Sequence, residues 1–223
     1  MTAWFVTGTD TGVGKSRFSA ALLHALARSG QRFVGMKPIA AGAEPDVHGV
    51  LQNEDVVSLR AASNVQVPHA LDNPYLLRDP VSPHIAAARE QVQIDVHLLR
   101  ERFLQLQTLA DAVVVEGAGG FCVPLSDSVT GADLAQALQL PVILVVGLRL
   151  GCLNHALLTK EAIAARGLRL AGWVANVIDP RMLQPQANLD YLAARLQAPL
   201  LAHWPWDPEA QPDQLTLTLP TDA

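Results

Sequence analysis

The stretch Gly8-Thr9-Asp10-Thr11-Gly12-Val13-Gly14-Lys15-Ser16 decides the fold class. It follows an apolar run at 3–7 that has the length of a strand, and it precedes a helical pattern of apolar residues at about 16–29. A glycine-rich turn between a strand and a helix is the context of a phosphate-binding loop, or P-loop. In such a loop, backbone N–H groups and the helix N-terminus face a polyphosphate. Lys15 would reach the β- and γ-phosphates, and the Ser16 hydroxyl would bind Mg²⁺.

The glycine spacing of this loop departs from the common pattern. Most P-loops have four residues between the first glycine and Gly-Lys, whereas five residues lie between Gly8 and Gly14. A glycine turn that begins a helix without binding a ligand is the alternative interpretation. The strand before the turn and the helix after it favour nucleotide binding.

Short apolar runs alternate with helical patterns along the rest of the chain. We expect strands at 3–7, 32–37, 112–116, 141–146, 170–177 and 199–204. We expect helices at 16–29, 53–62, 82–91, 95–109, 153–166 and 187–197, with caps at Asn53, Ser82, Asp95 and, before a further short helix, Thr130. The alternation predicts an α/β fold: a single-domain P-loop NTPase fold whose mostly parallel sheet of about seven strands has helices on both faces.

Two segments show no clear period. Residues 65–82 contain three prolines and are predicted to form a long loop. The polar, proline-rich tail at 207–223 is predicted to be either an edge strand or loosely ordered. No repeat or composition break divides the sequence, so residues 1–223 are predicted to form one domain.

The composition excludes several classes of protein. Half of the residues are hydrophobic and 17% are charged, which excludes a disordered or low-complexity chain. The net charge of -5 gives no indication of nucleic acid or an anionic membrane as a partner. The longest apolar run, 140–148, is too short to span a bilayer, and the first residues lack a secretory pattern. Two cysteines form no disulfide framework or zinc site, so a cytoplasmic protein with free thiols is expected.

The chain contains three lysines, Lys15, Lys37 and Lys160, against 13 arginines. Lys37 ends the predicted strand at 32–37, and strand ends of this kind face the ligand crevice of an open α/β sheet. It would meet negative charge on a transferring phosphoryl group or an acceptor carboxylate. A surface lysine at a strand end is the alternative. Lys160 is interpreted as part of a solvated helix face.

Two carboxylates are candidate magnesium ligands. Glu116 ends an apolar strand and precedes Gly117-Ala118-Gly119-Gly120, where a ligand can approach the backbone. P-loop proteins place a metal-binding carboxylate at such a strand end, so magnesium is favoured over a simple strand-end acid. Asp55 is a further candidate, and it would equally serve as a first-turn helix acid.

The P-loop and eight further motifs, in order along the chain, resemble the dethiobiotin synthetase family over about residues 3–207. They are Thr7-Gly-Thr-Asp-Thr-Gly-Val-Gly-Lys-Ser16, Met36-Lys-Pro38, Asn73-Pro-Tyr75, Ser82-Pro-His84, Val115-Glu-Gly-Ala-Gly-Gly120, Pro124-Leu-Ser-Asp127, Leu140-Pro-Val-Ile-Leu-Val-Val-Gly147, Leu150-Gly-Cys-Leu-Asn-His155 and Ala171-Gly-Trp-Val-Ala-Asn176. The five-residue P-loop spacing is itself a mark of that family.

The resemblance implies a homodimeric ligase of biotin synthesis that uses ATP and Mg²⁺. Its substrates would be 7,8-diaminopelargonic acid, CO₂ and ATP. One substrate amine would take up CO₂ as a carbamate, and the carbamate would attack the γ-phosphate of ATP. The second amine would then displace phosphate from the carbamic–phosphoric anhydride and close a cyclic urea.

The resemblance also implies roles for individual residues. Lys37 and Lys15 would be catalytic, and Ser16, Asp55 and Glu116 would hold Mg²⁺. The nucleotide would contact Thr11, Gly12, Val13, Gly14, Lys15, Ser16, Arg17, Asp55, Glu116, Gly117, Ala118, Gly119, Asn176, Val177, Pro205, Trp206 and Asp207. The substrate would contact Lys37, Ala41 and Ser82, and the neighbouring subunit would bind its carboxylate tail with Gly151, Cys152, Leu153 and Asn154.

Two positions differ from the family pattern, and two other functions compete with this interpretation. Ala41 stands where family members often have a serine that hydrogen-bonds the substrate, and Gly12 stands where some have a glutamate near the diamine. A partition-type switch ATPase is one rival, but such proteins carry an early P-loop lysine where this chain has Asp10. A related ligase acting on a corrinoid carboxylate is the other, and the Lys37 context and the run Leu150-Gly-Cys-Leu-Asn154 argue for the diamine.

Overall fold

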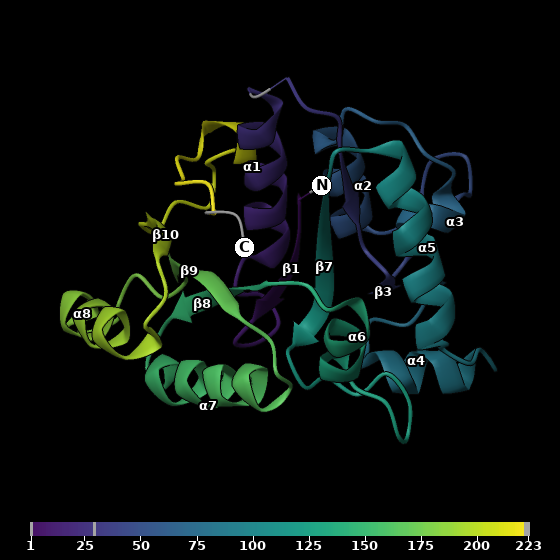
Figure 1. Ribbon diagram of the computed structural model, residues 1–223. Coiled ribbons are helices and arrows are strands. Elements are labelled where there is room, and N and C mark those ends of the chain that lie inside the picture. Colours follow the sequence, from purple (N-terminus) through teal and green to yellow (C-terminus); the bar gives the residue numbers. More distant parts are fainter. Residues whose placement is uncertain (1, 29, 221–223) are drawn as a thin grey trace.

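A computed structural model describes residues 2–28 and 30–220 of the chain. Its centre is a parallel sheet in the order β10-β9-β8-β1-β7-β2, which has six strands within the described residues (Figure 1). The strands are β1 (Thr2–Gly8), β2 (Phe33–Met36), β7 (Ala112–Gly120), β8 (Val142–Leu148), β9 (Leu170–Val177) and β10 (Leu200–Trp204). The predicted α/β fold with a parallel sheet is confirmed.

Helices cover both faces of the sheet because its strands are apolar on both faces. Alternate residues of β7 point to opposite faces: Val114 packs on the side of α1 (Lys15–Ala27) and α2 (Glu54–Ala62), and Val115 packs on the other side. The second face is covered by α4 (Pro83–Arg89), α5 (Val96–Leu109), α6 (Gly131–Leu138), α7 (Cys152–Ala165) and α8 (Pro185–Leu196).

Helix starts follow the expected caps, with one exception. The side chains of Asn53, Asp95 and Thr130 accept hydrogen bonds from the backbone N–H groups of the first turns of α2, α5 and α6. Thr130 also forms a capping box with Asp133. Ser82 does not cap α4; its hydroxyl instead lies 2.9 Å from Nδ1 of His84.

Several short elements were not expected from the sequence. Within the predicted loop at 65–82, the chain forms α3 (His69–Asp72) and β6 (Tyr75–Leu77), and β6 pairs in parallel with β3 (Ile39–Ala41). A hairpin joins β4 (Glu44–Pro45) to β5 (Leu51–Gln52). Elements of two to four residues are too short to show a period, so the pattern of apolar residues does not reveal them.

The C-terminal tail runs back along the first face of the sheet. After the 3₁₀ helix η1 (Pro212–Gln214), Leu215 and Leu217 pack on the cluster around α1. The Trp204 indole donates to the carbonyl of Thr216 at 3.0 Å, and the Thr218 N–H donates to the carbonyl of Leu201 at 2.8 Å. The end of the predicted tail, 221–223, lies outside the described residues.

The register of three adjacent strands brings the predicted site residues together. Val6 of β1 pairs with Glu116 of β7, so Glu116 lies beside the strand that leads into the P-loop. Met36 of β2 pairs with Val115, so Lys37 emerges next to Glu116. Within the described part of the chain, no helix is long and apolar enough to cross a membrane.

Candidate functional site

The loop between β1 and α1 is closely packed around its glycines. Gly14 has φ of 96°, a left-handed conformation that favours glycine, and a Cβ there would collide with the Asn176 amide. A Cβ on Gly8 would lie 2.6 Å from a methyl group of Val13. Side chains are therefore excluded where the backbone turns toward the start of α1, as a phosphate-binding loop requires.

Lys15 lies in the first turn of α1, and its ammonium donates to the carbonyl oxygen of Asp10 at 3.0 Å. Burial, followed by the nearby charge of Lys37, lowers the pKa of Lys15 to about 8 against the attraction of the surrounding carboxylates. The side chain is therefore still mostly protonated at neutral pH. It is a buried cation inside the loop, and anionic phosphate would satisfy it.

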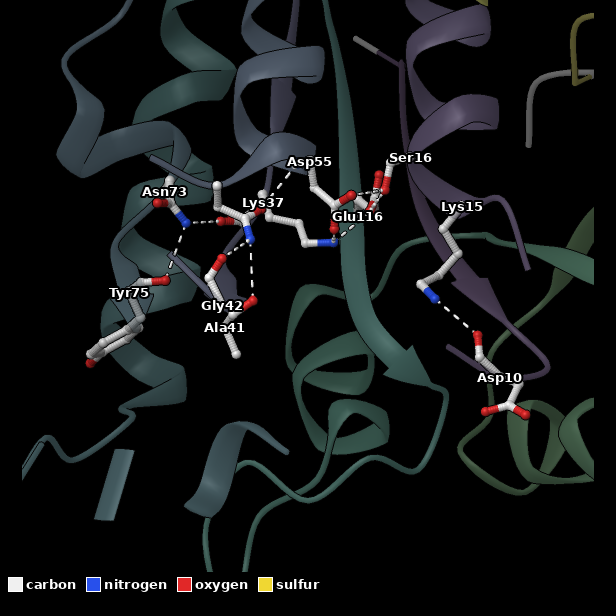
Figure 2. A network of polar contacts seen from close by, with 11 residues as sticks. Asp10, Lys15, Ser16, Lys37, Ala41, Gly42, Asp55, Asn73, Tyr75 and Glu116 are labelled. Carbon is white, nitrogen blue, oxygen red and sulfur yellow. Dashed lines mark hydrogen bonds and ion pairs between the residues drawn. The ribbon is translucent and has the colours of Figure 1, made fainter. Parts of the chain in front are cut away.

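Four side chains meet beside the loop (Figure 2). The Lys37 ammonium donates to Asp55 at 2.7 Å and to Glu116 at 2.5 Å. The Ser16 hydroxyl lies 2.5 Å from Asp55 and 2.7 Å from Glu116. All three predicted magnesium ligands therefore converge on one point, and the Lys37 ammonium lies among them.

The fold explains why these four residues meet. Glu116 alternates with Val115 along β7, so its side chain points to the face covered by α1 and α2. Ser16 lies in the first turn of α1 on that face. Asp55 lies in the first turn of α2, where Asn53 caps the helix. Lys37 extends from the end of β2, so the four residues come from two neighbouring strands and two helices.

Charge complementarity favours the charged forms of Lys37 and Asp55. Burial alone would lower the pKa of Lys37, but the carboxylates of Glu116 and Asp55 outweigh it and raise that pKa. Burial likewise acts to raise the pKa of Asp55, and the Lys37 ammonium outweighs it, so the carboxyl lies below its usual range. The Lys37 side chain is 4% exposed and that of Glu116 is fully buried. Removing either charge would leave the other unpaired in the interior.

The residues present fit a hard divalent cation. Oε2 of Glu116 is buried without a hydrogen-bond partner, which leaves an oxygen lone pair free for a further ligand. Hydroxyl and carboxylate oxygens are the donors that Mg²⁺ prefers. In residues 2–28 and 30–220, no three His, Cys, Asp or Glu side chains gather to hold a metal on their own. A cation here would complete its shell with phosphate oxygens and water.

A cavity of about 680 Å³ opens over the loop and the four-residue cluster. Its volume suits a ligand of nucleotide size. The predicted site residues that line it are Thr11, Gly12, Gly14, Lys15, Ser16, Arg17, Lys37, Ala41, Asp55, Ser82, Ala118 and Gly119. Phosphate-loop, metal-ligand and substrate predictions therefore fall on one cavity.

Other predicted site residues do not line this cavity. Asn176, the last residue but one of β9, lies beside the loop, where its amide donates to the Val13 carbonyl at 2.9 Å while its Oδ1 is buried without a partner. Val177 closes β9, and Pro205, Trp206 and Asp207 follow β10 on the surface. Val13, Glu116 and Gly117 do not line the cavity either, but Glu116 contacts Ser16 and Lys37, which do.

Gly151, Cys152, Leu153 and Asn154 lie at the start of α7, away from this cavity. A second hollow of about 430 Å³ lies between the loop and α7, and it shares Thr11, Gly119 and Val123 with the first. Leu158 of α7 lines it and is 56% exposed. Because none of the four residues Gly151 to Asn154 lines the first cavity, the start of α7 contributes nothing to the nucleotide cavity of its own chain.

Sequence reasoning assigned no role to several residues near the site. Asn73 donates from its side-chain amide to the carbonyl of Lys37, and Arg60 forms an ion pair with Asp72 beside it. Arg149 pairs with Asp10 of the loop. In the sequence, only the motif Asn73-Pro-Tyr75 pointed to any of these residues, and it did not indicate that Asn73 bonds to the backbone of Lys37.

Comparisons with known proteins agree with this geometry. A family model described as an AAA domain matches residues 2–214. A protein of Aromatoleum aromaticum named ATP-dependent dethiobiotin synthetase is 55% identical over 97% of this chain and 96% of its own length. A protein of the same name from Xanthomonas axonopodis pv. citri is 51% identical over 93% of this chain and 92% of its own.

Solved structures share the fold at low identity. The MinC:MinD cell division complex of Aquifex aeolicus aligns with a TM-score of 0.60 and 15% identity, over 94% of this chain and 83% of that one. A ParA family ATPase of Chlorobium tepidum aligns with a TM-score of 0.58 and 14% identity, over 93% and 86%. These structures support the nucleotide-binding fold alone.

Proposed function

Because the chain belongs to the family of ATP-dependent dethiobiotin synthetases, we propose that it closes a cyclic urea on 7,8-diaminopelargonic acid with carbon from CO₂. It is an ATP-dependent ligase that forms dethiobiotin in biotin biosynthesis. The relatives at 50–55% identity carry this one name, so a partition-type ATPase and a corrinoid ligase are not favoured. The observation that carries the mechanism is that Lys15, Lys37 and Asp55 line one nucleotide-sized cavity, while the buried Glu116 bonds to Lys37 beside it.

The proposed reaction has three bond-forming steps. A substrate amine attacks CO₂ and loses a proton to give a carbamate. A carbamate oxygen attacks the γ-phosphorus of ATP, and the bond from that phosphorus to the β-phosphate oxygen breaks to release ADP. The second amine attacks the carbamate carbon and loses a proton, the bond from this carbon to the phosphate oxygen breaks, and inorganic phosphate leaves as the ring closes.

The second step brings two anions together, so it needs cations beside both. We assign Lys15 to the β- and γ-phosphates, because its ammonium lies inside the loop. We assign Lys37 to the attacking carbamate and the transferring phosphoryl group, because its buried ammonium reaches the cavity from the neighbouring strand end. The two lysines act as fixed charges that stabilise negative charge as it develops.

Magnesium belongs to this proposal. Ser16, Asp55 and Glu116 would hold the ion, and bound Mg²⁺ would neutralise phosphate charge. The convergence of their oxygens and the unpartnered Oε2 of Glu116 support the assignment. When that ion is held, the Lys37 ammonium is no longer needed as the partner of both carboxylates and is available to the substrate.

We assign the nucleotide base to the edge of the sheet formed by β9 and β10. Oδ1 of Asn176 is a buried acceptor without a partner, which suits an exocyclic amino group of a purine. Val177 and the segment Pro205, Trp206 and Asp207 would border the base, and Thr11 through Arg17 would surround the phosphates. Trp206 is half exposed, as a residue that packs on a bound ring would be.

The substrate would lie between two copies of the chain. Lys37, Ala41 and Ser82 line the cavity on the side of the diamine, whereas Gly151, Cys152, Leu153 and Asn154 lie apart at the start of α7. A helix N-terminus binds carboxylates, so this segment of one subunit would hold the substrate tail in the cavity of the other. Leu150 beside it is 93% exposed, which suits a face covered by a second copy. The homodimer is proposed to act in the cytoplasm.

One experiment tests the proposed reaction. The protein is incubated with ATP, Mg²⁺, bicarbonate and 7,8-diaminopelargonic acid, and the products are analysed by mass spectrometry. We expect a product heavier than the diamine by one carbonyl group less two hydrogens, with ADP release that depends on the diamine. Absence of that product together with diamine-independent ADP release would overturn the proposal.

A further inference from the structure

The backbone of Lys37 is held by two consecutive residues from a distant part of the chain. Lys37 lies just beyond β2 and is followed by Pro38, so the sheet does not fix it. Its N–H donates to the carbonyl of Asp72 at 2.8 Å. Its carbonyl accepts from Nδ2 of Asn73 at 2.7 Å. Both polar backbone groups of the lysine are therefore satisfied by the end of α3.

The Asn73 side chain is buried and its orientation is determined. Its Nδ2 also donates to the carbonyl of Tyr75 at 3.2 Å, so the amide nitrogen joins two carbonyl oxygens that cannot donate (Figure 2). Only 7% of Asn73 is exposed. Replacing the amide with a group that lacks N–H would leave the Lys37 carbonyl buried and without this donor.

An ion pair fixes the position of Asp72 in turn. Arg60 in the last turn of α2 donates to both carboxylate oxygens of Asp72, each at 2.7 Å. The first turn of the same helix carries Asp55, which accepts from the Lys37 ammonium. One helix therefore sets the position of the lysine at both ends: Asp55 contacts its side chain, and Arg60 holds the residue that binds its backbone.

We propose that Asn73 is a positioning residue for Lys37, with the Arg60–Asp72 ion pair supporting it. The side chain of Lys37 is long, so a change in its backbone moves the ammonium relative to the cavity. Misplacement of a reacting or stabilising group by about 1 Å costs up to about a hundredfold in rate. The proposal rests on the role assigned to Lys37 above, and it names the residues that position this lysine.

Asn64 provides a matched control at the other end of the same strand. Its Oδ1 accepts from the N–H of Phe33 at 2.8 Å, and its Nδ2 donates to the carbonyl of Gln31 at 2.9 Å. Asn64 and Asn73 thus each brace one end of β2, but only Asn73 contacts the lysine. Asn64 is exposed and Asn73 is buried, so a purely structural role for Asn73 would lower the unfolding temperature further but would not make the loss of kcat depend on Lys37.

The test is a mutant cycle that compares Asn73→Ala with Asn64→Ala in the native and Lys37→Ala backgrounds. The readouts are kcat, the Kd for ADP and the unfolding temperature. We expect Asn73→Ala to lower kcat about tenfold or more, with the Kd for ADP within about twofold, because Asn73 does not touch the loop. Asn64→Ala should leave kcat within about twofold. In the Lys37→Ala background, Asn73→Ala should add less than about twofold.

Each other result overturns the proposal or its premise. Equal losses of kcat from Asn73→Ala in both backgrounds, or equal losses from Asn64→Ala and Asn73→Ala, would show that Asn73 does not act through Lys37. If Lys37→Ala turns over at the native rate, the role of Lys37 is wrong. If Lys37→Ala is inactive but Asn73→Ala is not impaired, only the positioning is wrong. Should Asn73→Ala fail to fold, Arg60→Met replaces it in the same cycle. We then expect a smaller loss of kcat, which again should depend on the presence of Lys37.

Discussion

At the scale of single residues, the proposed role of Lys37 as a fixed positive charge gives the most specific prediction. Lys37→Ala is expected to keep nucleotide binding and to lose turnover by about a hundredfold or more, because a fixed charge at the transferring phosphoryl group is removed. Lys37→Arg is expected to be nearly as poor, since a planar guanidinium does not replace a point charge in a site of fixed shape. Steady-state turnover and equilibrium binding of ADP measure the two effects.

Lys160→Arg is the matched control for these variants. The Lys160 ammonium donates to the Arg195 carbonyl at 2.6 Å on the surface, and its hydrogen bonds reach none of the four cluster residues. It should turn over at the native rate. A fully active Lys37→Arg would show that any cation at this position is sufficient, which would contradict the account.

The crowding of the lysine and the metal ligands predicts an effect on metal binding. Lys37 bonds to the same carboxylates that would hold the ion, so Lys37→Ala should bind Mn²⁺ more tightly than the native protein in the absence of nucleotide. Glu116→Gln should bind it more weakly, because a charged ligand is lost. Titration of Mn²⁺ followed by electron paramagnetic resonance measures both. Equal affinities in the three proteins would exclude these side chains as ligands.

Local patterns were sufficient to predict where the P-loop, Lys37 and Glu116 lie, because each occupies a recognisable place next to a strand. Asp55 remained ambiguous between a metal ligand and a helix acid, and its contacts with Ser16 and Lys37 show why: it is both in the first turn and in the cluster. The role of Asn73 could not be predicted, because its partner lies 36 residues away in the sequence.

At the scale of elements, the long helices and strands were predictable and the short ones were not. The strands at the centre of the sheet are continuous apolar runs, and the longer helices show a clear period. In contrast, α3 and β6 have four and three residues, and they form because Lys37 and β3 supply their backbone partners. Their stability is tertiary, so no local pattern specifies them.

The start of α6 allows a prediction about stability and pH. Burial acts to raise the pKa of Asp133, but hydrogen bonds from Thr130 and Arg166 outweigh it and hold that pKa below the usual 3.8. The stabilisation from the carboxylate is therefore present above about pH 4 and is lost as the pH falls through the native pKa. Asp133→Asn should lower the free energy of unfolding by about 0.5–1 kcal/mol at neutral pH.

Thermal unfolding of Asp133→Asn at two pH values measures this effect. A loss of that size corresponds to a few degrees in Tm for a chain of this length, and the difference from native should shrink as the pH falls below about 4 and through the native pKa of Asp133. Asp127→Asn is the control, because Asp127 is exposed and has no hydrogen bond within the described residues. A difference that stays constant with pH would contradict the assignment.

At the scale of the whole molecule, the proposed dimer predicts complementation between inactive subunits. Lys37→Ala inactivates a cavity from within, and Asn154→Glu would repel the substrate carboxylate in the cavity of the neighbour. Asn154 is exposed at the start of α7, so the second change should not disturb the fold. A mixed dimer then contains one cavity with both changes and one with neither.

Mixing the two inactive variants should therefore restore about a quarter of the native activity after subunit exchange, because half of the dimers are mixed and each has one intact site. Turnover after mixing, with exchange confirmed by native mass spectrometry, is the measurement. Exchange without recovery of activity would place all substrate contacts within one subunit.

The path of one oxygen atom tests most directly whether ATP phosphorylates the carbamate. If a carbamate oxygen attacks the γ-phosphate, one oxygen of CO₂ leaves with phosphate when the urea ring closes. Turnover with freshly dissolved CO₂ labelled with ¹⁸O should therefore yield inorganic phosphate carrying one labelled oxygen, detected by mass spectrometry. Unlabelled phosphate formed together with the urea product would contradict the account, because it would show that the carbamate is never phosphorylated.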